Sequence, residues 1–248
     1  GLFPKEIEDA LLDRRADIAV HSMKDVPTAL PAGLVVAALL PREDPRDALI
    51  AERARRIVEI PHGAVVGTAS LRRKAMLLHR RPDLAVVPLR GNVETRLKRI
   101  AEGAVGATFL AIAGLKRLGL ADRATAILDP DEMLPAVCQG AIGIECRAGD
   151  DAARALLASI DDRATAICAA AERAFLAALD GSCRTPIGGL AVLDGDRVHL
   201  RGMIVRPDGS EALTVERRGA AADAASLGAD AGDELRARAP SGFFADAG

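Results

Sequence analysis

An alternation of short apolar segments and helix-like segments in the middle of the chain constrains its fold most strongly. Residues 64–67 are predicted to form a strand and residues 71–80 a helix. The pattern repeats as a strand over 84–89 and a helix over 93–102, and it continues through 107–118. Because strands and helices alternate, we predict an α/β fold with doubly wound sheets.

The segments before this alternation are predicted to belong to a separate unit. Residues 4–15 have helical apolar spacing, and 17–20 and 33–40 are short apolar segments typical of buried strands. A polar crossing follows at 42–47, where we place a domain boundary. The stretch between that crossing and residue 64 is polar and helix-like.

The segments after the alternation are predicted to form another strand and then a small α+β unit. Residues 141–145 are expected to form a strand, and 150–179 have the alanine-rich spacing of helices. A hairpin is predicted at Asp194-Gly195, followed by a strand over 211–217 and a final helix.

Length, charge and cysteine usage exclude several classes of protein. A chain of 248 residues is expected to form two or three compact units. No apolar run approaches the roughly 18 residues that span a bilayer, and the first residues contain no secretory signal. The net charge of −2 does not indicate a nucleic-acid or membrane surface. We therefore expect no nucleic-acid partner and no membrane partner, and we expect a monomer.

The cysteines and histidines indicate neither a metal site nor a disulfide framework. The four cysteines contain no Cys-x-x-Cys pair, and the four histidines contain no pair with ligand spacing. We therefore predict no metal and a location in a reducing cytoplasm.

Three polar loops, at residues 21–25, 68–73 and 90–96, follow predicted strands. Ligands of open α/β sheets gather beyond the carboxyl ends of strands, where helix N-termini offer free N–H groups. These loops predict a cleft for a polycarboxylate or a phosphate, although each arginine taken alone is equally consistent with a solvated helix face. The hydroxyl and basic side chains that the loops would bring together are Lys24, Thr68, Ser70, Arg72, Arg73, Arg90 and Arg96.

Two further residues are candidates for chemistry. Asp25 lies in a loop closed by Pro27, where its carboxylate would transfer a proton, stabilise a cationic intermediate or simply form a turn. Cys183 lies in a Gly-Ser-Cys-Arg-Thr-Pro loop, where Arg184 would favour its thiolate. The other three cysteines lie in apolar segments and are expected to pack in cores.

Six motifs occur together in this chain. They are DIAVHSMKDVP at 17–27, GTASLRR at 67–73, LRGNVETRL at 89–97, AGLKRLG at 113–119, LPAVCQG at 134–140 and GSCRTPIG at 181–188. In order and spacing they resemble the porphobilinogen deaminase family, also called hydroxymethylbilane synthase, over nearly the whole chain.

The resemblance implies a transferase of haem and other tetrapyrrole biosynthesis. Such an enzyme condenses four porphobilinogen molecules head to tail into hydroxymethylbilane and releases ammonia at each step. The resemblance also implies a dipyrromethane cofactor, bound by a thioether to Cys183, and a catalytic role for Asp25. The residues that it implies for substrate and cofactor binding are Ser22, Lys24, Thr68, Ser70, Arg72, Arg73, Arg90, Arg96, Arg117 and Gln139.

The resemblance implies three domains as well. Two periplasmic-binding-like doubly wound domains would flank a cleft, and a small C-terminal α+β domain would anchor the cofactor. We expect the first to comprise residues 1–42 with 141–160, the second 43–140 and the third 161–248.

Two departures from the family pattern lead to further expectations. Family members have additional residues before the position of Gly1, including an opening strand. If the protein consists of these 248 residues alone, we expect an incomplete first domain, poor stability and little or no turnover. Cys138 stands where glycine or alanine is more usual, which suggests a second thiol near the cleft.

Two other classes of function remain open at this stage. Two doubly wound domains around a basic cleft also describe a non-enzymatic binding protein for a small anion. A thiol hydrolase would use Cys183 with His21 or His199, although no motif for such a nucleophile surrounds the cysteine.

Overall fold

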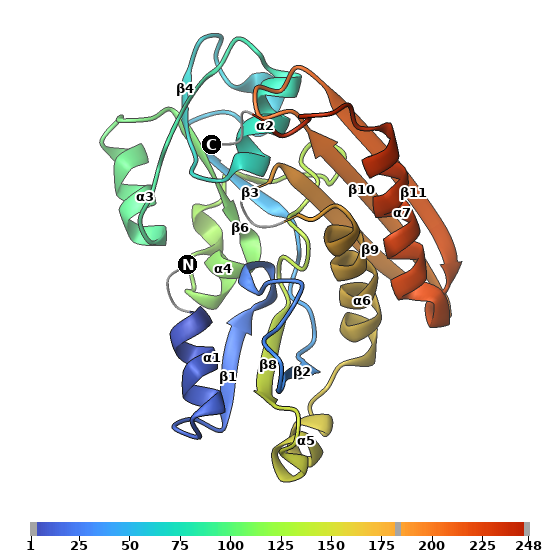
Figure 1. The fold of residues 1–248 in the computed structure, drawn as a ribbon. Coiled ribbons are helices and arrows are strands. Elements are labelled where there is room, and N and C mark those ends of the chain that lie inside the picture. The colour runs from blue at the N-terminus through green and yellow to red at the C-terminus, as the bar shows by residue number, and fades with distance from the viewer. Residues whose placement is uncertain (1–3, 182–184, 246–248) are drawn as a thin grey trace.

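A computed structural model describes residues 4–181 and 185–245 of the chain. In this part of the chain the strands form three sheets, of three, five and three strands. Figure 1 shows the three sheets as separate layers, each accompanied by its own helices. No helix in the described part of the chain is long and apolar enough to cross a membrane.

The first sheet joins the beginning of the chain to a segment that returns much later. Its strands are β1 (Ile18–Ser22), β2 (Leu34–Leu39) and β8 (Ile142–Arg147), in the order β1-β8-β2. Both pairings are antiparallel. Helices α1 (Pro4–Leu12) and α5 (Asp151–Ala158) pack against this sheet. The predicted late strand is therefore confirmed.

The second sheet is mixed and contains five strands. These are β3 (Asp47–Ala51), β4 (Val65–Gly67), β5 (Ala85–Val87), β6 (Ala107–Ala111) and β7 (Ala126–Ile127). Their order is β5-β4-β6-β3-β7, with β4 parallel to β5 and β6 and with β3 antiparallel to both of its neighbours. The parallel half is the predicted β/α alternation.

Three helices connect the strands of the second sheet, as the alternation predicted. They are α2 (Leu71–Arg80), α3 (Val93–Ala101) and α4 (Ile112–Arg117). The Ser70 side chain caps α2 by accepting a hydrogen bond from the Arg73 N–H at 3.4 Å, and Asn92 caps α3 from an equivalent position. Both caps place a helix N-terminus beyond the end of a strand.

The expected helix-like stretch between residues 48 and 63 is wrong. The chain forms β3 here and then a short 3₁₀ turn, Ile57–Glu59. Ala48 and Leu49 are fully buried because β3 lies between β6 and β7, so tertiary burial decides the local structure. Asp47, which was expected in a polar crossing, is the first residue of this strand and is buried.

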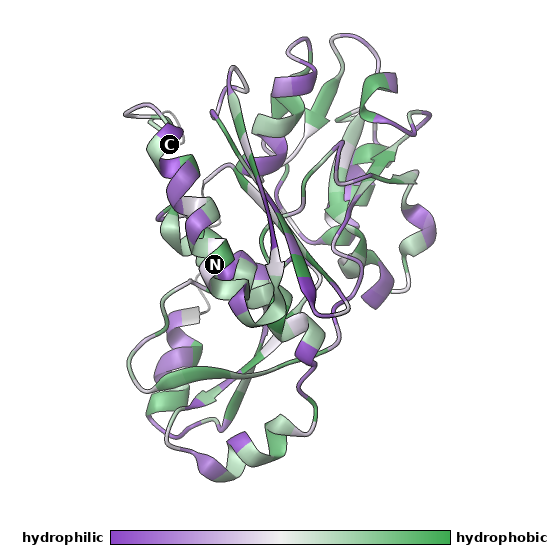
Figure 2. Ribbon diagram, turned by 90° about the vertical axis from the view of Figure 1, so that its right-hand side faces the viewer, coloured by the Kyte–Doolittle hydropathy of each residue, from purple (hydrophilic) through white to green (hydrophobic). Residues whose placement is uncertain are grey.

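The third sheet is an antiparallel meander beside two long helices. Its strands are β9 (Ile187–Asp194), β10 (Arg197–Val205) and β11 (Ala212–Ala220), and the predicted hairpin at Asp194-Gly195 is confirmed. Helices α6 (Arg163–Ala178) and α7 (Ala224–Arg238) pack on each other and on this sheet. Figure 2 shows that these helices carry both hydrophobic and hydrophilic residues. The predicted fold class, α/β with a C-terminal α+β unit, is confirmed.

A buried carboxylate joins the three sheets. Glu172 of α6 is fully buried and pairs with both terminal nitrogens of the Arg42 guanidinium, at 2.6 and 3.1 Å. Its two oxygens also accept the backbone N–H groups of Cys138 and Ala191. Burial alone would lower the pKa of Arg42, but the charge of Glu172 outweighs it and raises this pKa. Arg42 therefore keeps its charge at neutral pH.

We predict that Glu172→Gln destabilises the protein by about 3–5 kcal/mol, because Arg42 would remain buried without its counter-charge. Urea unfolding followed by circular dichroism measures this loss. Glu102→Gln is the matched control. It breaks an exposed pair with Lys98 in α3, and its expected cost is below about 1 kcal/mol. Equal stability of the two variants would contradict the role assigned to Glu172.

Candidate functional site

A pocket of about 260 Å³ opens where the three sheets approach one another. The segment after β1, the first turn of α2, the segment before β8 and the start of β9 all contribute to its lining. Seven of the residues predicted from the sequence line it, namely Lys24, Asp25, Ser70, Arg72, Arg73, Arg96 and Gln139. The structure therefore brings most of the predicted set together.

Lys24 and Asp25 reach the pocket from a short 3₁₀ turn, Met23–Asp25, directly after β1. The buried Met23 anchors this turn, and its backbone N–H donates to Ala141 O at 3.1 Å. Asp25 is exposed. Burial, and then the positive charge of Arg73, lowers the pKa of the Lys24 ammonium, although Asp25 opposes the shift.

Two arginines in the first turn of α2 are almost completely buried and share one carboxylate. Arg73 donates from Nε and Nη2 to Oδ1 of Asp47, at 3.1 and 2.6 Å, and from Nη1 to Phe109 O. Arg72 Nη1 lies 2.8 Å from Asp47 Oδ2 and donates to Leu134 O at 2.7 Å. The Nε of Arg72 has no hydrogen-bond partner in the described part of the chain.

Asp47 was missed by the sequence interpretation, which placed it in a polar crossing. It is fully buried beneath the pocket, at the start of β3. Burial alone would raise its pKa, but the charges of Arg72 and Arg73 outweigh this effect and hold the pKa far below its usual range. The sequence feature that could have indicated a buried Asp47 is its position as a single acid immediately before the apolar run 48–51.

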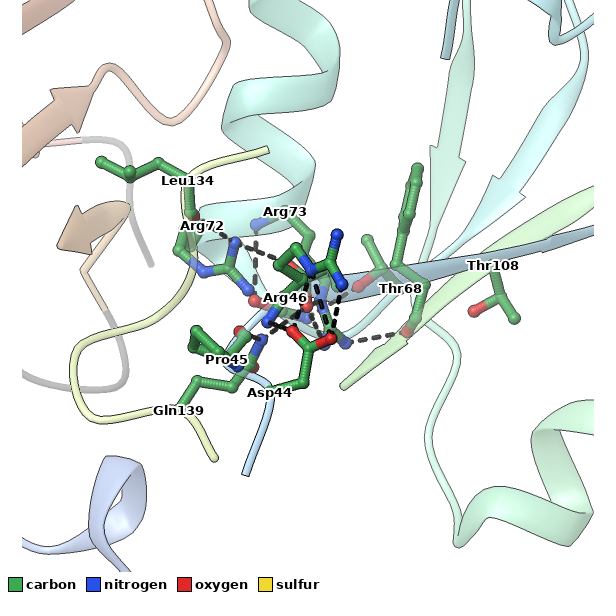
Figure 3. Close-up of polar contacts among 12 residues, drawn as sticks. Asp44, Pro45, Arg46, Thr68, Arg72, Arg73, Thr108, Leu134 and Gln139 are labelled. Carbon is green, nitrogen blue, oxygen red and sulfur yellow. Dashed lines mark hydrogen bonds and ion pairs between the residues drawn. The ribbon is translucent and has the colours of Figure 1, made fainter. Parts of the chain in front are cut away.

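Gln139 completes the group around Asp47. It is buried, and its Nε2 donates to Asp47 Oδ1 at 2.9 Å and to Pro45 O at 2.7 Å. Figure 3 shows Arg72, Arg73 and Gln139 converging beside Pro45. The floor of the pocket is thus a connected polar network that includes two guanidinium groups.

Arg96 approaches the same pocket from α3. Its Nε donates to Gly91 O at 2.9 Å. This hydrogen bond holds the side chain close to the N-terminus of α3. Burial, and then the charge of Arg73, lowers its pKa. The mutual repulsion of these cations indicates a pocket prepared for negative charge.

Four residues of the predicted set do not line this pocket. Ser22 is half-buried at the end of β1, and the buried Thr68 accepts a hydrogen bond from Ser70 N at 3.1 Å. Arg90 is exposed, and Arg117 donates to Gly140 O at 2.8 Å. Thr68 and Arg117 thus shape neighbouring backbone, and binding roles for the four residues stay predictions.

The cysteines fall into two groups. Cys138, Cys146 and Cys168 are buried and free, as predicted for core residues. Cys138 lies between two residues that line the pocket, Val137 and Gln139, but it is fully buried and does not line the pocket itself. Burial, reinforced by Glu172, raises the pKa of its thiol. Cys183 lies outside the described residues.

The two histidines considered for a thiol hydrolase, His21 and His199, each contact a carboxylate among the described residues. The Nε2 of His21 lies 2.8 Å from Glu145 Oε2, and that of His199 lies 3.3 Å from Glu216 Oε2. Among the residues that the structure describes, no group of three His, Cys, Asp or Glu side chains could hold a metal ion.

The fold and the pocket together define a class, that of α/β proteins with a basic pocket suited to a multiply charged anion. Comparison with known families is more specific. The model described as porphobilinogen deaminase, dipyromethane cofactor binding domain, matches residues 1–155, and that of the porphobilinogen deaminase C-terminal domain matches 166–237. The chain belongs to the porphobilinogen deaminase family. It is therefore a transferase of tetrapyrrole biosynthesis, as the resemblance implied.

Curated relatives agree with this membership. The porphobilinogen deaminase of Paracoccus denitrificans is 60% identical, over 98% of this chain and 78% of the relative. That of Nitrobacter hamburgensis is 59% identical, over 98% and 77%. Among solved structures, a putative methionine-binding lipoprotein from Bacillus subtilis matches with 16% identity and a TM-score of 0.41, covering 63% of this chain and 74% of that one.

We predict that Lys24→Met raises the melting temperature at pH 7. The lowered pKa of Lys24 means that its charge costs stability at every pH below the folded-state pKa, and this cost is relieved only as the pH rises from there toward 10.5. The expected increase is about 2 °C or more, the size of a 1 kcal/mol stabilisation in a chain of this length.

Differential scanning calorimetry measures the change, with Lys98→Met on the exposed face of α3 as the control. We expect that control to shift the melting temperature by less than about 1 °C. A lower melting temperature for Lys24→Met than for the control would show that the ammonium stabilises the folded state.

Proposed function

We propose that this chain condenses four porphobilinogen molecules into hydroxymethylbilane on a dipyrromethane primer attached through a thioether to Cys183. The observation that carries the proposal is the pocket, in which Lys24, Arg72, Arg73 and Arg96 surround a space edged by the exposed Asp25. Porphobilinogen carries an acetate and a propionate arm, so each added ring brings two carboxylates to this basic site.

The residues present fit a dipyrromethane group. The arginine floor is rigid, and Arg72 Nε remains a donor without a partner in the described part of the chain. Guanidinium groups bind carboxylates in a bidentate geometry, which orients a ring as well as neutralising its charge. When bound, the cofactor supplies the pyrrole carbon that attacks the next substrate.

Asp25 is proposed as the catalytic residue. When ammonia leaves porphobilinogen, the remaining methylene-pyrrole is a cation, and a carboxylate beside it lowers the energy of that charge. The exposed position of Asp25 at the pocket edge suits this role, because the group is accessible to an incoming substrate. The same carboxylate can accept a hydrogen bond from a pyrrole N–H.

Lys24, the arginines and Ser70 are proposed to hold the acidic arms. Lys24 lies beside Asp25 in the chain, so it would place an arm while Asp25 faces the ring. Ser70 and the N-terminus of α2 offer further donors at the same edge.

The attachment role of Cys183 is supported by the residues that flank its loop. Thr185 and Ile187, just after it, line the pocket, and so does Leu176 of the preceding helix. In the sequence Cys183 is two residues from Thr185, which supports the proposal that its thiol is the attachment point. A thiolate adds to the same electrophilic methylene that the growing pyrrole chain attacks, so the enzyme can build its primer from substrate.

The predicted domains fit the three sheets. Strands β1, β2 and β8 fall within residues 1–42 and 141–160, strands β3 to β7 within 43–140, and strands β9 to β11 within 161–248. The three described cysteines are free, which suits a reducing cytoplasm. We propose these boundaries and this location.

We predict that the enzyme isolated from active cells has an intact mass two pyrrole units above that of its sequence. Cys183→Ser should lose this increment, because a hydroxyl is a much weaker nucleophile than a thiolate. Cys168→Ser, at a buried thiol, is the control and should keep it. An unmodified wild-type mass would favour the non-enzymatic anion-binding protein instead.

We predict that Asp25→Asn lowers the rate of ammonia release from porphobilinogen by about 10²-fold or more, since the charge that stabilises the cation is removed. Asp122→Asn, at an exposed residue of the 3₁₀ turn Ala121–Arg123, is the control for the charge change. His21→Ala should retain most activity. A loss of activity in His21→Ala with activity retained in Asp25→Asn would overturn the assignment and revive the thiol hydrolase.

A further inference from the structure

Asp47 and Glu172 are both fully buried acids near the pocket, but only the partners of Asp47 among these two are side chains that line it. The Asp47 carboxylate contacts Arg72, Arg73 and Gln139, all of which line the pocket. These partners come from two segments far apart in the sequence, the first turn of α2 and the chain before β8. One carboxylate therefore fixes the relative positions of two segments that form the pocket floor.

The contacts of the two arginines differ in a way that Asp47 explains. All three guanidinium nitrogens of Arg73 donate, two of them to Asp47 and one to Phe109 O. Arg72 is held through Nη1 alone in the described hydrogen bonds, and its Nε is unpartnered. Arg73 is thus held by the protein through all three nitrogens, whereas Arg72 is held through Nη1, and both side chains line the pocket.

The charges around the pocket also indicate that Asp47 holds the two arginines in place. Four cationic side chains line the pocket, and among its lining residues only Asp25 is acidic, at the exposed edge. Two guanidinium groups packed side by side repel each other strongly when they are buried. Asp47 lies between them and stays ionised, since their charges keep its pKa low. The arginines can therefore stay in place before any carboxylate arrives.

We propose that Asp47 is a positioning residue for carboxylate recognition, which holds Arg72 and Arg73 in the geometry that receives the acidic arms of the cofactor and substrate. Asp47 touches neither the ring nor the reacting atoms; it acts through the two arginines. This inference rests on the binding roles proposed above for Arg72 and Arg73.

The test replaces Asp47 by Asn, which removes the charge and keeps the size. We expect the KM for porphobilinogen to rise about tenfold or more, while kcat per loaded enzyme falls less than about threefold, because recognition is lost and Asp25 remains. We also expect fewer than half of the chains to carry the cofactor by intact mass. Asp47→Glu, which keeps the charge at a longer reach, should restore KM and loading in part.

Asp44→Asn is the matched control. Asp44 lies three residues away on the same segment and pairs with Arg46, and neither residue lines the pocket. We expect wild-type KM and loading for this variant. Melting temperatures are measured for all variants, so that a loss of folding is separated from a loss of recognition.

Two results would overturn the proposal. The first is a folded Asp47→Asn variant with wild-type KM and loading. The second is the absence of a cooperative unfolding transition in both Asp47 variants, which would assign this carboxylate to the fold alone. Failure of the proposed function has a different signature, since the wild-type protein itself would then show an unmodified mass and no turnover of porphobilinogen.

Discussion

The arrangement of the three sheets depends on the buried carboxylate of Glu172. Its partner Arg42 lies where the chain leaves the first sheet, Cys138 lies where it returns, and Ala191 belongs to β9. Both crossings between the first and second sheets are thereby hydrogen-bonded to one side chain of α6. A buried ion pair gains little net stability over an apolar contact, but it tolerates few alternative geometries. The pocket lies between the sheets, so its shape depends on how the sheets are arranged.

The segment from Leu134 to Gly140 connects the hydrogen bonds of Glu172 to the residues of the pocket floor. Glu172 accepts the N–H of Cys138, Asp47 accepts the side-chain amide of Gln139, and Leu134 O accepts from Arg72. The segment can follow this path because Gly140 has a φ of +90° and a Cβ there would lie 2.2 Å from Glu43 O. The two buried carboxylates, on α6 and β3, therefore hold the same seven residues from both sides.

Periodicity predicted what depends on local sequence. Helix α2 has the predicted bounds, and the Asp194-Gly195 hairpin is present, because capping and turn chemistry are encoded within a few residues. Strand β3 was missed because its neighbours β6 and β7, which bury it, lie some 60 to 80 residues further along the chain. Asp47 was missed for the same reason: its partners are distant in sequence, so nothing local distinguishes a buried acid from a solvated one. The resemblance to the family identified most of the charged and polar residues of the pocket, because its motifs include residues that are distant in sequence but lie in one site.

The different hydrogen bonds of Arg72 and Arg73 suit a pocket that binds a growing polyanion. A pocket of unpaired cations would be costly to assemble before substrate arrives, and it would hold an accumulating negative charge too firmly for product release. Pairing Arg73 with the Asp47 carboxylate removes part of that excess and fixes the position of the guanidinium group. Under the binding roles proposed above, Lys24, Arg72 and Arg96, whose pKa values are all lowered, would attract each new pair of carboxylates. Burial, and then the charge of Arg73, disfavours the charged form of these three groups, so an anionic ring bound beside them would relieve that cost.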